Sequence, residues 1–255
     1  MYLKRKADAY LNAWKSDPNR SPLIIKGPRQ VGKTETIDYF AAHNYRSVVE
    51  INFVEEPKYR AITADGYGAD TIVRNISLID PAKKFIPGDT LIFFDEIQAH
   101  PDIATALKFF KIDGKYDVIC SGSMLGISYK QIESNSVGYK TDYEMRSLDF
   151  EEFLWARGYD EAVIESMFTH LCDATPFSEV EMNVFSTAFM DYCVLGGMPA
   201  VVASHIRTGT FEGTLQLQRQ LILDYQEDIR KYAQGLDQAR ILNVLNHIPV
   251  QLAQE

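Results

Sequence analysis

The sequence predicts an α/β fold in which a parallel sheet is flanked by helices and is followed by an all-helical extension. Up to about residue 146, short apolar runs alternate with segments of helical periodicity, which is typical of a parallel sheet. After that point the pattern is helical throughout. We therefore expect two domains, residues 1–146 and residues 147–255.

The predicted strands of the first domain are marked by apolar runs at 23–26, 47–53, 90–95 and 117–121, with a weaker one at 142–145. Between the third and fourth strands, Ile103, Leu107 and Phe110 recur at helical spacing, which predicts a helix with one buried face. Pro101 precedes them, at a position where the first turn of a helix tolerates proline.

The extension is predicted to contain helices alone. Asp149 and Glu152 have the spacing of a capping box, which opens a helix by satisfying its first amide groups. Further helices are expected near 160–172, 178–194, 199–206, 211–233 and 237–251. The sequence GGMP at 196–199 must break the helical pattern, because glycine and proline together do so reliably.

Composition and charge exclude several classes of function. The chain is 46% hydrophobic and 24% charged, as in ordinary globular proteins. Its net charge of -9 provides no overall positive field for nucleic acid or an anionic membrane, and the basic residues 4–6 are interpreted as a solvated helix face. Cys120, Cys172 and Cys193 are too few for a disulfide framework. The start is not a secretory signal and no apolar segment approaches about 20 residues, so we expect a cytoplasmic protein without a membrane partner.

Residues 27–34, GPRQVGKT, fit the phosphate-loop pattern between a predicted strand and a predicted helix. Glycines let backbone N–H groups approach an anion, the helix points its positive end at the anion, and the lysine spans the β and γ phosphates. The threonine hydroxyl is expected on Mg²⁺. A glycine-rich turn without a ligand is the alternative. The predicted cofactors are ATP and Mg²⁺, and the predicted binding residues are Gly27, Pro28, Arg29, Gln30, Val31, Gly32, Lys33, Thr34 and Glu35.

The apolar run 91–94 leads into two carboxylates, Asp95 and Glu96. Four consecutive apolar residues predict a buried parallel strand whose carboxyl end meets a ligand. Asp95 would hold Mg²⁺, mostly through its water shell, and Glu96 would orient and polarise an attacking water. Alone, such a run indicates only a strand that leads into a solvated loop. Together with the phosphate loop, it favours a catalytic site.

A further buried strand is predicted at 118–121, and it ends in small hydroxyl side chains. Ser121 is expected to contact the γ-phosphate or the water, with Ser123 behind it. By itself this SGS sequence would indicate a turn. Nearer the C-terminus, Asp228 and Arg230 are interpreted as a solvated helix face, with a second-site arginine as the alternative.

Together, these motifs resemble a prokaryotic AAA-type P-loop ATPase family. The resemblance rests on GPRQVGKT, LIFFDEIQAHPD, CSGS, SLDFEEFL at 147–154 and YCVLGGMPA at 192–200, and it covers nearly the whole chain. In that family the core precedes a helical region catalogued as domain of unknown function 4143. The resemblance implies an ATPase core in which the Ser121 strand lies between the Gly27 and Asp95 strands. It also implies a homo-oligomer whose subunits share ATP sites.

The sequence departs from this family in two places. Members usually carry a Gly-Arg pair shortly before a PLSF-like segment, whereas this chain has Gly138-Tyr139-Lys140 before SLDF. If the family's arginine reaches into the next subunit, Lys140 or Arg146 must substitute for it, and a lysine lacks the arginine fork. Relatives also continue past Glu255 into a part that resembles restriction endonucleases, so we expect a fragment of a longer protein without nuclease activity.

The sequence thus predicts an Mg-ATP hydrolase whose cycle moves the helical region, and it leaves the protein or DNA client unidentified. The alternative is a slow or non-hydrolysing ATP switch that presents its helices to a partner. The Tyr139 departure favours the switch, and the intact carboxylate pair favours turnover. A small-molecule kinase fits less well, because adjacent Asp and Glu suit attack by water. The predicted catalytic residues are Glu96, Asp95, Ser121 and Arg146, and the predicted metal ligands are Thr34 and Asp95.

Overall fold

The computed structural model describes residues 1–123, 136, 138–232 and 236–252. The strands are β1 (Leu23–Gly27), β2 (Ser47–Asn52), β3 (Thr90–Asp95), β4 (Asp117–Ser123) and β5 (Thr141–Glu144). The helices that accompany them are α1 (Lys6–Ser16), α2 (Lys33–Asn44), α3 (Ala69–Ile79) and α4 (Ile103–Asp113), with short 3-10 helices at Pro57–Thr63 and Ile97–Ala99. The C-terminal helices are α5 (Phe150–Ala156), α6 (Glu161–Asp173), α7 (Glu179–Leu195), α8 (Pro199–Thr208), α9 (Thr214–Tyr232) and α10 (Leu236–Leu252).

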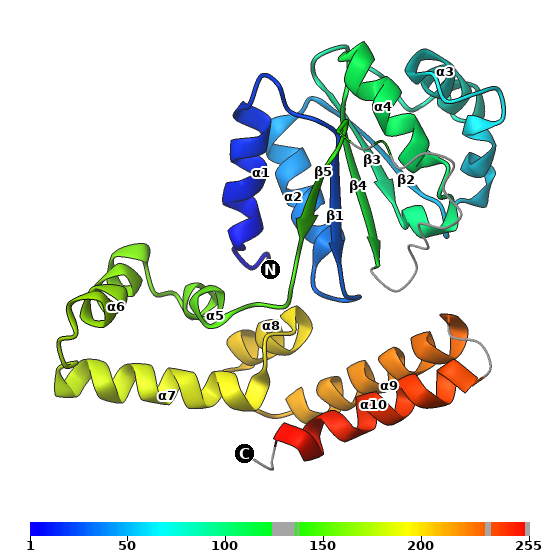
Figure 1. Cartoon of the computed structure of the whole chain (residues 1–255). Helices are drawn as coiled ribbons and strands as arrows, with labels where there is room; N and C mark the ends of the chain where they lie inside the picture. Colours follow the sequence, from blue (N-terminus) through cyan, green and yellow to red (C-terminus); the bar gives the residue numbers. More distant parts are fainter. Residues whose placement is uncertain (124–135, 137, 233–235, 253–255) are drawn as a thin grey trace.

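The described strands form one parallel sheet in the order β2-β3-β4-β1-β5. The predicted fold class is therefore confirmed, as is the expectation that the Ser121 strand lies between the Gly27 and Asp95 strands. Because all these strands run in the same direction, their carboxyl ends meet at one edge of the sheet. Figure 1 shows that this edge faces the C-terminal helices. Residues that follow β1, β3 and β4 are thereby brought together.

Both faces of the sheet are covered by helices, which explains the continuous apolar run of β3. Leu91 and Phe93 pack on the face covered by α1 and α2, whereas Ile92 and Phe94 pack on the face covered by α3 and α4. All four side chains are fully buried. Successive residues of a strand point to opposite faces, so a strand between two helical layers must be apolar throughout.

The opposite, amino-terminal edge of the sheet is held by a largely buried acidic side chain, that of Asp117, the first residue of β4. Its carboxylate accepts hydrogen bonds from Arg20 Nε at 2.7 Å, Tyr45 Oη at 2.7 Å and Lys15 Nζ at 3.1 Å. Burial raises the pKa of Asp117, but these hydrogen bonds outweigh burial and hold it below its usual value. The contact ties α1 and the segment after α2 to the start of the central strand.

The C-terminal helices begin with the predicted capping box. Glu152 N donates to Asp149 Oδ1 at 2.9 Å, and Glu152 Oε2 accepts from Asp149 N at 3.2 Å. The helices have an apolar cluster of their own, which includes Leu148, Phe153 and Val201. Leu3 lies in the same cluster, so the N-terminal segment packs against the helical region as well as against the sheet.

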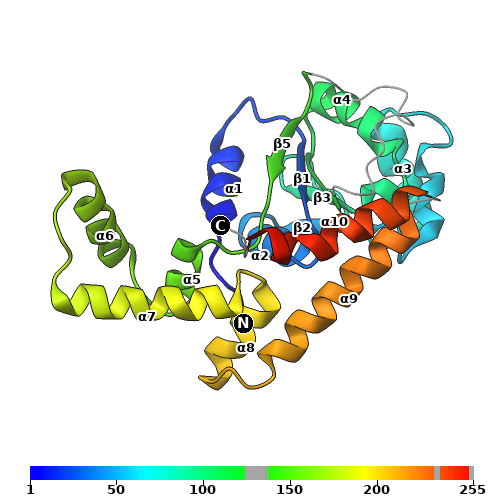
Figure 2. The same cartoon turned by 60° about the horizontal axis from the view of Figure 1, so that its bottom comes forward.

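Two parts of the helical region lie near the carboxyl edge of the sheet. The first is the turn before α8, where Gly196 ends α7 with a φ of 68° and Pro199 is the first residue of α8. The second is the α9–α10 hairpin, which crosses below the carboxyl edge of the sheet in Figure 1 and in front of it in Figure 2.

Among the described residues, we find no helix with the length and apolar character that a transmembrane span requires.

Candidate functional site

The loop between β1 and α2 has the backbone shape of an anion-binding turn. Gln30 and Gly32 adopt left-handed conformations, with φ values of 63° and 91°, and Gly32 immediately precedes α2. Such alternation turns successive backbone N–H groups toward a common centre, and the first amides of a helix have no partner within the helix. A Cβ atom on Gly27 would lie 2.1 Å from the Met145 carbonyl oxygen, so only glycine permits this close approach.

Lys33, the first residue of α2, lies along this loop. Its ammonium group donates to the Gly27 carbonyl at 3.0 Å and to the Pro28 carbonyl at 2.7 Å. Burial lowers the pKa of Lys33, and the nearby carboxylates of Asp95 and Glu96 oppose that effect. The lysine is therefore held beside the loop and close to both predicted carboxylates.

Asp95 connects the predicted motifs to one another. Its Oδ2 accepts hydrogen bonds from Thr34 Oγ1 at 3.2 Å and from Asn52 Nδ2 at 3.3 Å, and its Oδ1 accepts one from Ser121 Oγ. The residue is only 4% exposed. The structure thus brings Thr34, Asp95 and Ser121 together, although they come from motifs that lie far apart in the chain. A threonine hydroxyl and a carboxylate are the oxygen donors that suit Mg²⁺.

Asn52 is a site residue that the sequence analysis missed. It is the last residue of β2, and its Cα lies opposite that of Asp95 in the sheet register. The signal was present in the sequence as an amide at the end of a predicted strand. The strand order is needed to place Asn52 beside Asp95, because that order makes β2 the neighbour of β3.

Glu96 adopts a left-handed backbone conformation with a φ of 55°. Its side chain is half-buried and accepts a hydrogen bond from Gln98 Nε2. Asp95 Oδ1 accepts a further bond from Glu96 N at 2.9 Å. The carboxylate that was predicted to activate water is therefore held by a nearby amide that the sequence analysis did not select.

The two cations that were predicted as substitutes for the family's arginine lie in different environments. Lys140 is engaged by both carboxylate oxygens of Asp142 at 2.7 Å, and its side chain is 8% exposed. The Arg146 side chain is 77% exposed and its Nε lies 3.0 Å from Glu144 Oε1. The Arg146 guanidinium therefore faces solvent, and within the described residues it makes no hydrogen bond to the phosphate loop of its own chain.

Ser123, which was predicted to lie behind Ser121, is the last residue of β4, and its side chain lies outside the described residues.

Arg5 corrects the interpretation of residues 4–6 as a solvated face. It is 4% exposed and donates to the Val31 carbonyl at 2.7 Å and to the Arg146 carbonyl at 2.6 Å. Its Nε lies 3.2 Å from Glu152 Oε1. One buried guanidinium therefore joins the phosphate loop, the end of the sheet and the first C-terminal helix.

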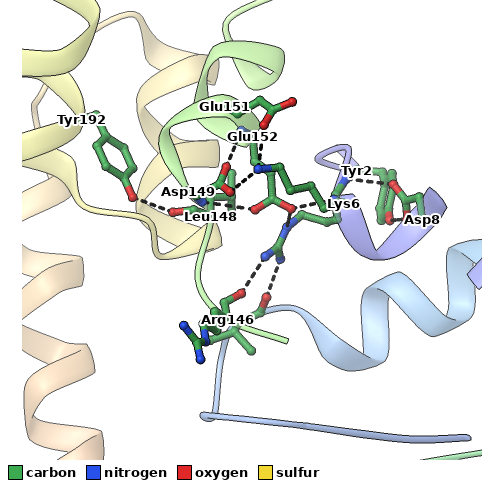
Figure 3. Close-up of polar contacts among 11 residues, drawn as sticks. Tyr2, Lys6, Asp8, Arg146, Leu148, Asp149, Glu151, Glu152 and Tyr192 are labelled. Atoms are coloured by element: carbon green, nitrogen blue, oxygen red, sulfur yellow. Dashed lines mark hydrogen bonds and ion pairs between the residues drawn. The ribbon is translucent and has the colours of Figure 1, made fainter. Parts of the chain in front are cut away.

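Neighbouring contacts hold the same junction. Figure 3 shows Lys6 beside the carboxylates of Asp149 and Glu151, at 2.5 Å and 2.6 Å. In the same view Tyr192 Oη donates to the Leu148 carbonyl at 2.8 Å. These bonds fasten the start of α1 and the end of α7 to the segment that leaves the sheet.

The GGMP turn lies against the same segment and close to the phosphate loop. Leu148 N donates to the Gly197 carbonyl at 2.7 Å, and a Cβ on Gly197 would lie 2.0 Å from the Leu148 carbonyl oxygen. A Cβ on Gly32 would lie 3.7 Å from Pro199 Cγ. The last two motifs of the sequence therefore pack together beside the phosphate loop, although they are far apart in the chain.

α9 also contacts the phosphate loop, and here the interpretation of Asp228 as a solvated residue is wrong. Asp228 is buried and pairs with the Arg29 guanidinium. Tyr225 Oη donates to the Arg29 carbonyl at 2.8 Å, and Gln30 Nε2 donates to Asp224 Oδ2 at 2.7 Å. Arg230 is exposed, in agreement with the solvated-face interpretation.

Comparisons with known proteins bear on both parts of the chain. Residues 19–154 match the family model described as AAA domain. Residues 186–255 match a domain of unknown function designated DUF8612, so the number 4143 that the resemblance implied for this region is corrected. A comparison with curated proteins finds no match.

Among solved structures, that of C. elegans PCH-2 is 11% identical with a TM-score of 0.37, and the match covers 68% of this chain and 48% of that one. The structure of a single-residue variant of Thermotoga maritima RuvB is 16% identical with a TM-score of 0.36, and the match covers 59% of this chain and 46% of that one. The matched parts thus span about half the length of these two proteins.

Proposed function

The chain belongs to the AAA domain family, and we propose that it binds Mg-ATP and hydrolyses it to move its C-terminal helices. The observation that carries this proposal is the convergence on Asp95. Three predicted residues from separate motifs, Thr34, Asp95 and Ser121, are hydrogen-bonded beside a loop whose glycines and left-handed turns suit a phosphate. ATP, when bound, supplies the γ-phosphoryl group, and Mg²⁺ neutralises its charge.

The binding roles follow from the donors that each residue offers. The backbone of residues 27–35, except Pro28, contributes N–H groups, the start of α2 contributes its positive end, and Lys33 adds a positive charge. Thr34 and Asp95 would hold Mg²⁺ through oxygen atoms. Asn52 keeps the Asp95 carboxylate oriented through its hydrogen bond to Oδ2. Ser121 would contact the γ-phosphate or the water from the central strand.

The proposed catalytic role of Glu96 is to orient the attacking water and accept its proton. Its place directly after Asp95 puts it at the same edge of the sheet as the phosphate loop, and the electrostatic influence of both carboxylates on Lys33 reflects this proximity. Arg146 is proposed to act on the ATP site of a neighbouring copy in a homo-oligomer, because its exposed guanidinium extends into solvent. The proposed location is the cytoplasm, in keeping with the sequence-based expectation.

Two variants test the proposal by calorimetry with Mg-ATP and by steady-state phosphate release. Lys33→Ala should abolish ATP binding. Glu96→Gln should retain ATP binding and lower phosphate release by about 10²–10⁴-fold, the usual contribution of a general base. Glu55→Gln is the matched control, because Glu55 is exposed and its substitution removes the same charge. Wild-type protein that gives no binding heat with Mg-ATP would refute the proposal.

The second candidate function is a slow ATP switch, and the Gln98–Glu96 hydrogen bond favours it. A glutamate that is held by an amide is restrained from meeting a water. The same assays separate the two functions. If wild type and Glu96→Gln bind ATP equally and release phosphate at the same slow rate, the chain is a switch and Glu96 has no water-activating role.

A further inference from the structure

α9 lies across the phosphate loop at three points, on two adjacent loop residues. The Arg29 guanidinium pairs with Asp228, the Arg29 carbonyl accepts from Tyr225, and the Gln30 amide donates to Asp224. We refer to these interactions as the α9 contact. A pocket of about 250 Å³ lies at the contact, lined by the two loop residues and four residues of α9.

The side of α9 that faces the loop is acidic. Asp224, Glu227 and Asp228 all line the pocket. The Asp228 side chain is 10% exposed and the Arg29 side chain is 32% exposed, so their ion pair is partly shielded from water. Electrostatic interactions between such shielded charges are stronger than those on the open surface.

Arg29 and Gln30 cannot bind the carboxylates of α9 and the phosphates of a nucleotide equally well at the same time. Phosphate and carboxylate oxygens bind guanidinium groups in the same geometry, through charge-assisted hydrogen bonds. A triphosphate on residues 27–35 would bring several negative charges to the loop that carries Arg29 and Gln30. The Asp228 and Asp224 carboxylates would then repel the ligand across a short, partly buried space, and they would compete with it for the same donors.

We propose that the acidic side of α9 competes with the phosphates of ATP for Arg29 and Gln30, so that ATP binding releases the α9–α10 hairpin from the loop. This inference rests on the proposed function, since it requires the nucleotide to occupy the phosphate loop. It assigns Asp228 and Asp224 as positioning residues and gives the Arg29 side chain a further partner, the phosphates of the nucleotide.

Linkage makes the proposal quantitative. If ATP weakens the α9 contact by some factor, then removal of the α9 contact must strengthen ATP binding by the same factor. Couplings of this kind typically change affinity by about 5–150-fold. The α10 helix should move with α9, because Gln226 Nε2 donates to Asn246 Oδ1 at 3.4 Å within the hairpin.

The first test measures the affinity for a non-hydrolysable ATP analogue by calorimetry with Mg²⁺. Asp228→Asn and Asp224→Asn each remove one of the competing charges and keep the shape of the side chain. We expect Asp228→Asn to lower the Kd by about tenfold and Asp224→Asn to lower it by less, because only Asp228 pairs with a charged group. Asp237→Asn, at an exposed position of α10, is the control with the same change in net charge, and its Kd should equal that of wild type.

The second test measures the position of α9 by energy transfer between two dyes. Exposed Cys172 and Cys193 are replaced by serine, and the labelled cysteines are introduced at Leu78 on α3 and Leu223 on α9, which are both exposed. The analogue should change the transfer efficiency of the labelled parent. In the Asp228→Asn background, the efficiency should already be shifted toward the analogue-bound value before the analogue is added.

The outcomes separate this inference from the proposed function. If the parent protein binds the analogue but both variants have an unchanged or higher Kd, the competition is refuted and ATP binding stands. An unchanged transfer efficiency on saturation of the parent refutes the release of α9 in the same way. If the parent protein does not bind the analogue, the proposed function fails together with this inference. Circular dichroism establishes that each variant is folded before these measurements.

Discussion

The role of Arg5 in joining the two parts of the chain gives the sharpest prediction for stability. Arg5→Met keeps a long apolar side chain and removes the guanidinium. The substitution leaves the buried Glu152 carboxylate without its cation, and it removes the donors to the Val31 and Arg146 carbonyls. Both Arg5 and Glu152 are buried, so water cannot readily replace the lost partner.

The expected loss follows from the energetics of buried ion pairs. Removal of one partner from such a pair costs about 3–5 kcal/mol, mainly because the other charge stays buried. For a chain of this size, a change of 1 kcal/mol shifts the melting temperature by about 2–4 °C, so the expected decrease is roughly 6–20 °C. Glu152→Gln in the Arg5→Met background should recover part of this loss, because it removes the unpaired charge.

The assay is thermal and urea unfolding of wild type, Arg5→Met, the double variant and Lys4→Ala. Lys4 is the matched control, because it neighbours Arg5 and pairs with Glu161, but its side chain is 53% exposed. Exposed pairs contribute less than about 1 kcal/mol, so Lys4→Ala should stay close to wild type. If Arg5→Met loses no more stability than Lys4→Ala, the assignment of Arg5 as a buried link between the two parts is wrong.

Three further predictions concern other parts of the structure. Gly27→Ala should abolish ATP binding or folding, because its Cβ would meet a carbonyl oxygen at 2.1 Å. The control, Gly68→Ala, should change the free energy of unfolding by less than about 1 kcal/mol. Calorimetry measures the binding, and thermal melts measure the stability. Asn52→Ala should retain ATP binding and lower phosphate release by about tenfold, since it orients a proposed metal ligand, and equal release would contradict that role. Asp117→Asn should cost about 1–3 kcal/mol at pH 7 in urea unfolding. Since the folded-state pKa of Asp117 is depressed, its contribution is complete above the unfolded value of about 3.9 and is lost as pH falls through the folded value. The difference from wild type should therefore shrink in acid, and a constant difference would contradict the linkage.

Local features of the fold and site could be predicted because neighbouring residues in the chain determine them. The continuous apolar run of β3 requires helices on both faces of the sheet. Gly32 adopts the left-handed conformation that glycine favours just before α2, and the Asp149–Glu152 capping box joins residues three apart. These interactions depend on spacing, so the sequence alone determined the phosphate loop, the acidic strand end and the start of the helical region.

The partners of the charged residues were decided only by the tertiary structure. Arg5 bonds to carbonyls 26 and 141 residues away, and Asp228 pairs with Arg29 across 199 residues. In the sequence Arg5 lies between two lysines at the start of a helix and Asp228 lies among charged residues of a helix, which is the pattern of a solvated face. Whether such a residue is exposed or buried depends on which element packs against its helix. That is settled by the strand order and by the path of the C-terminal helices, because the choice of a distant partner for a charged residue leaves no periodic signal in the chain.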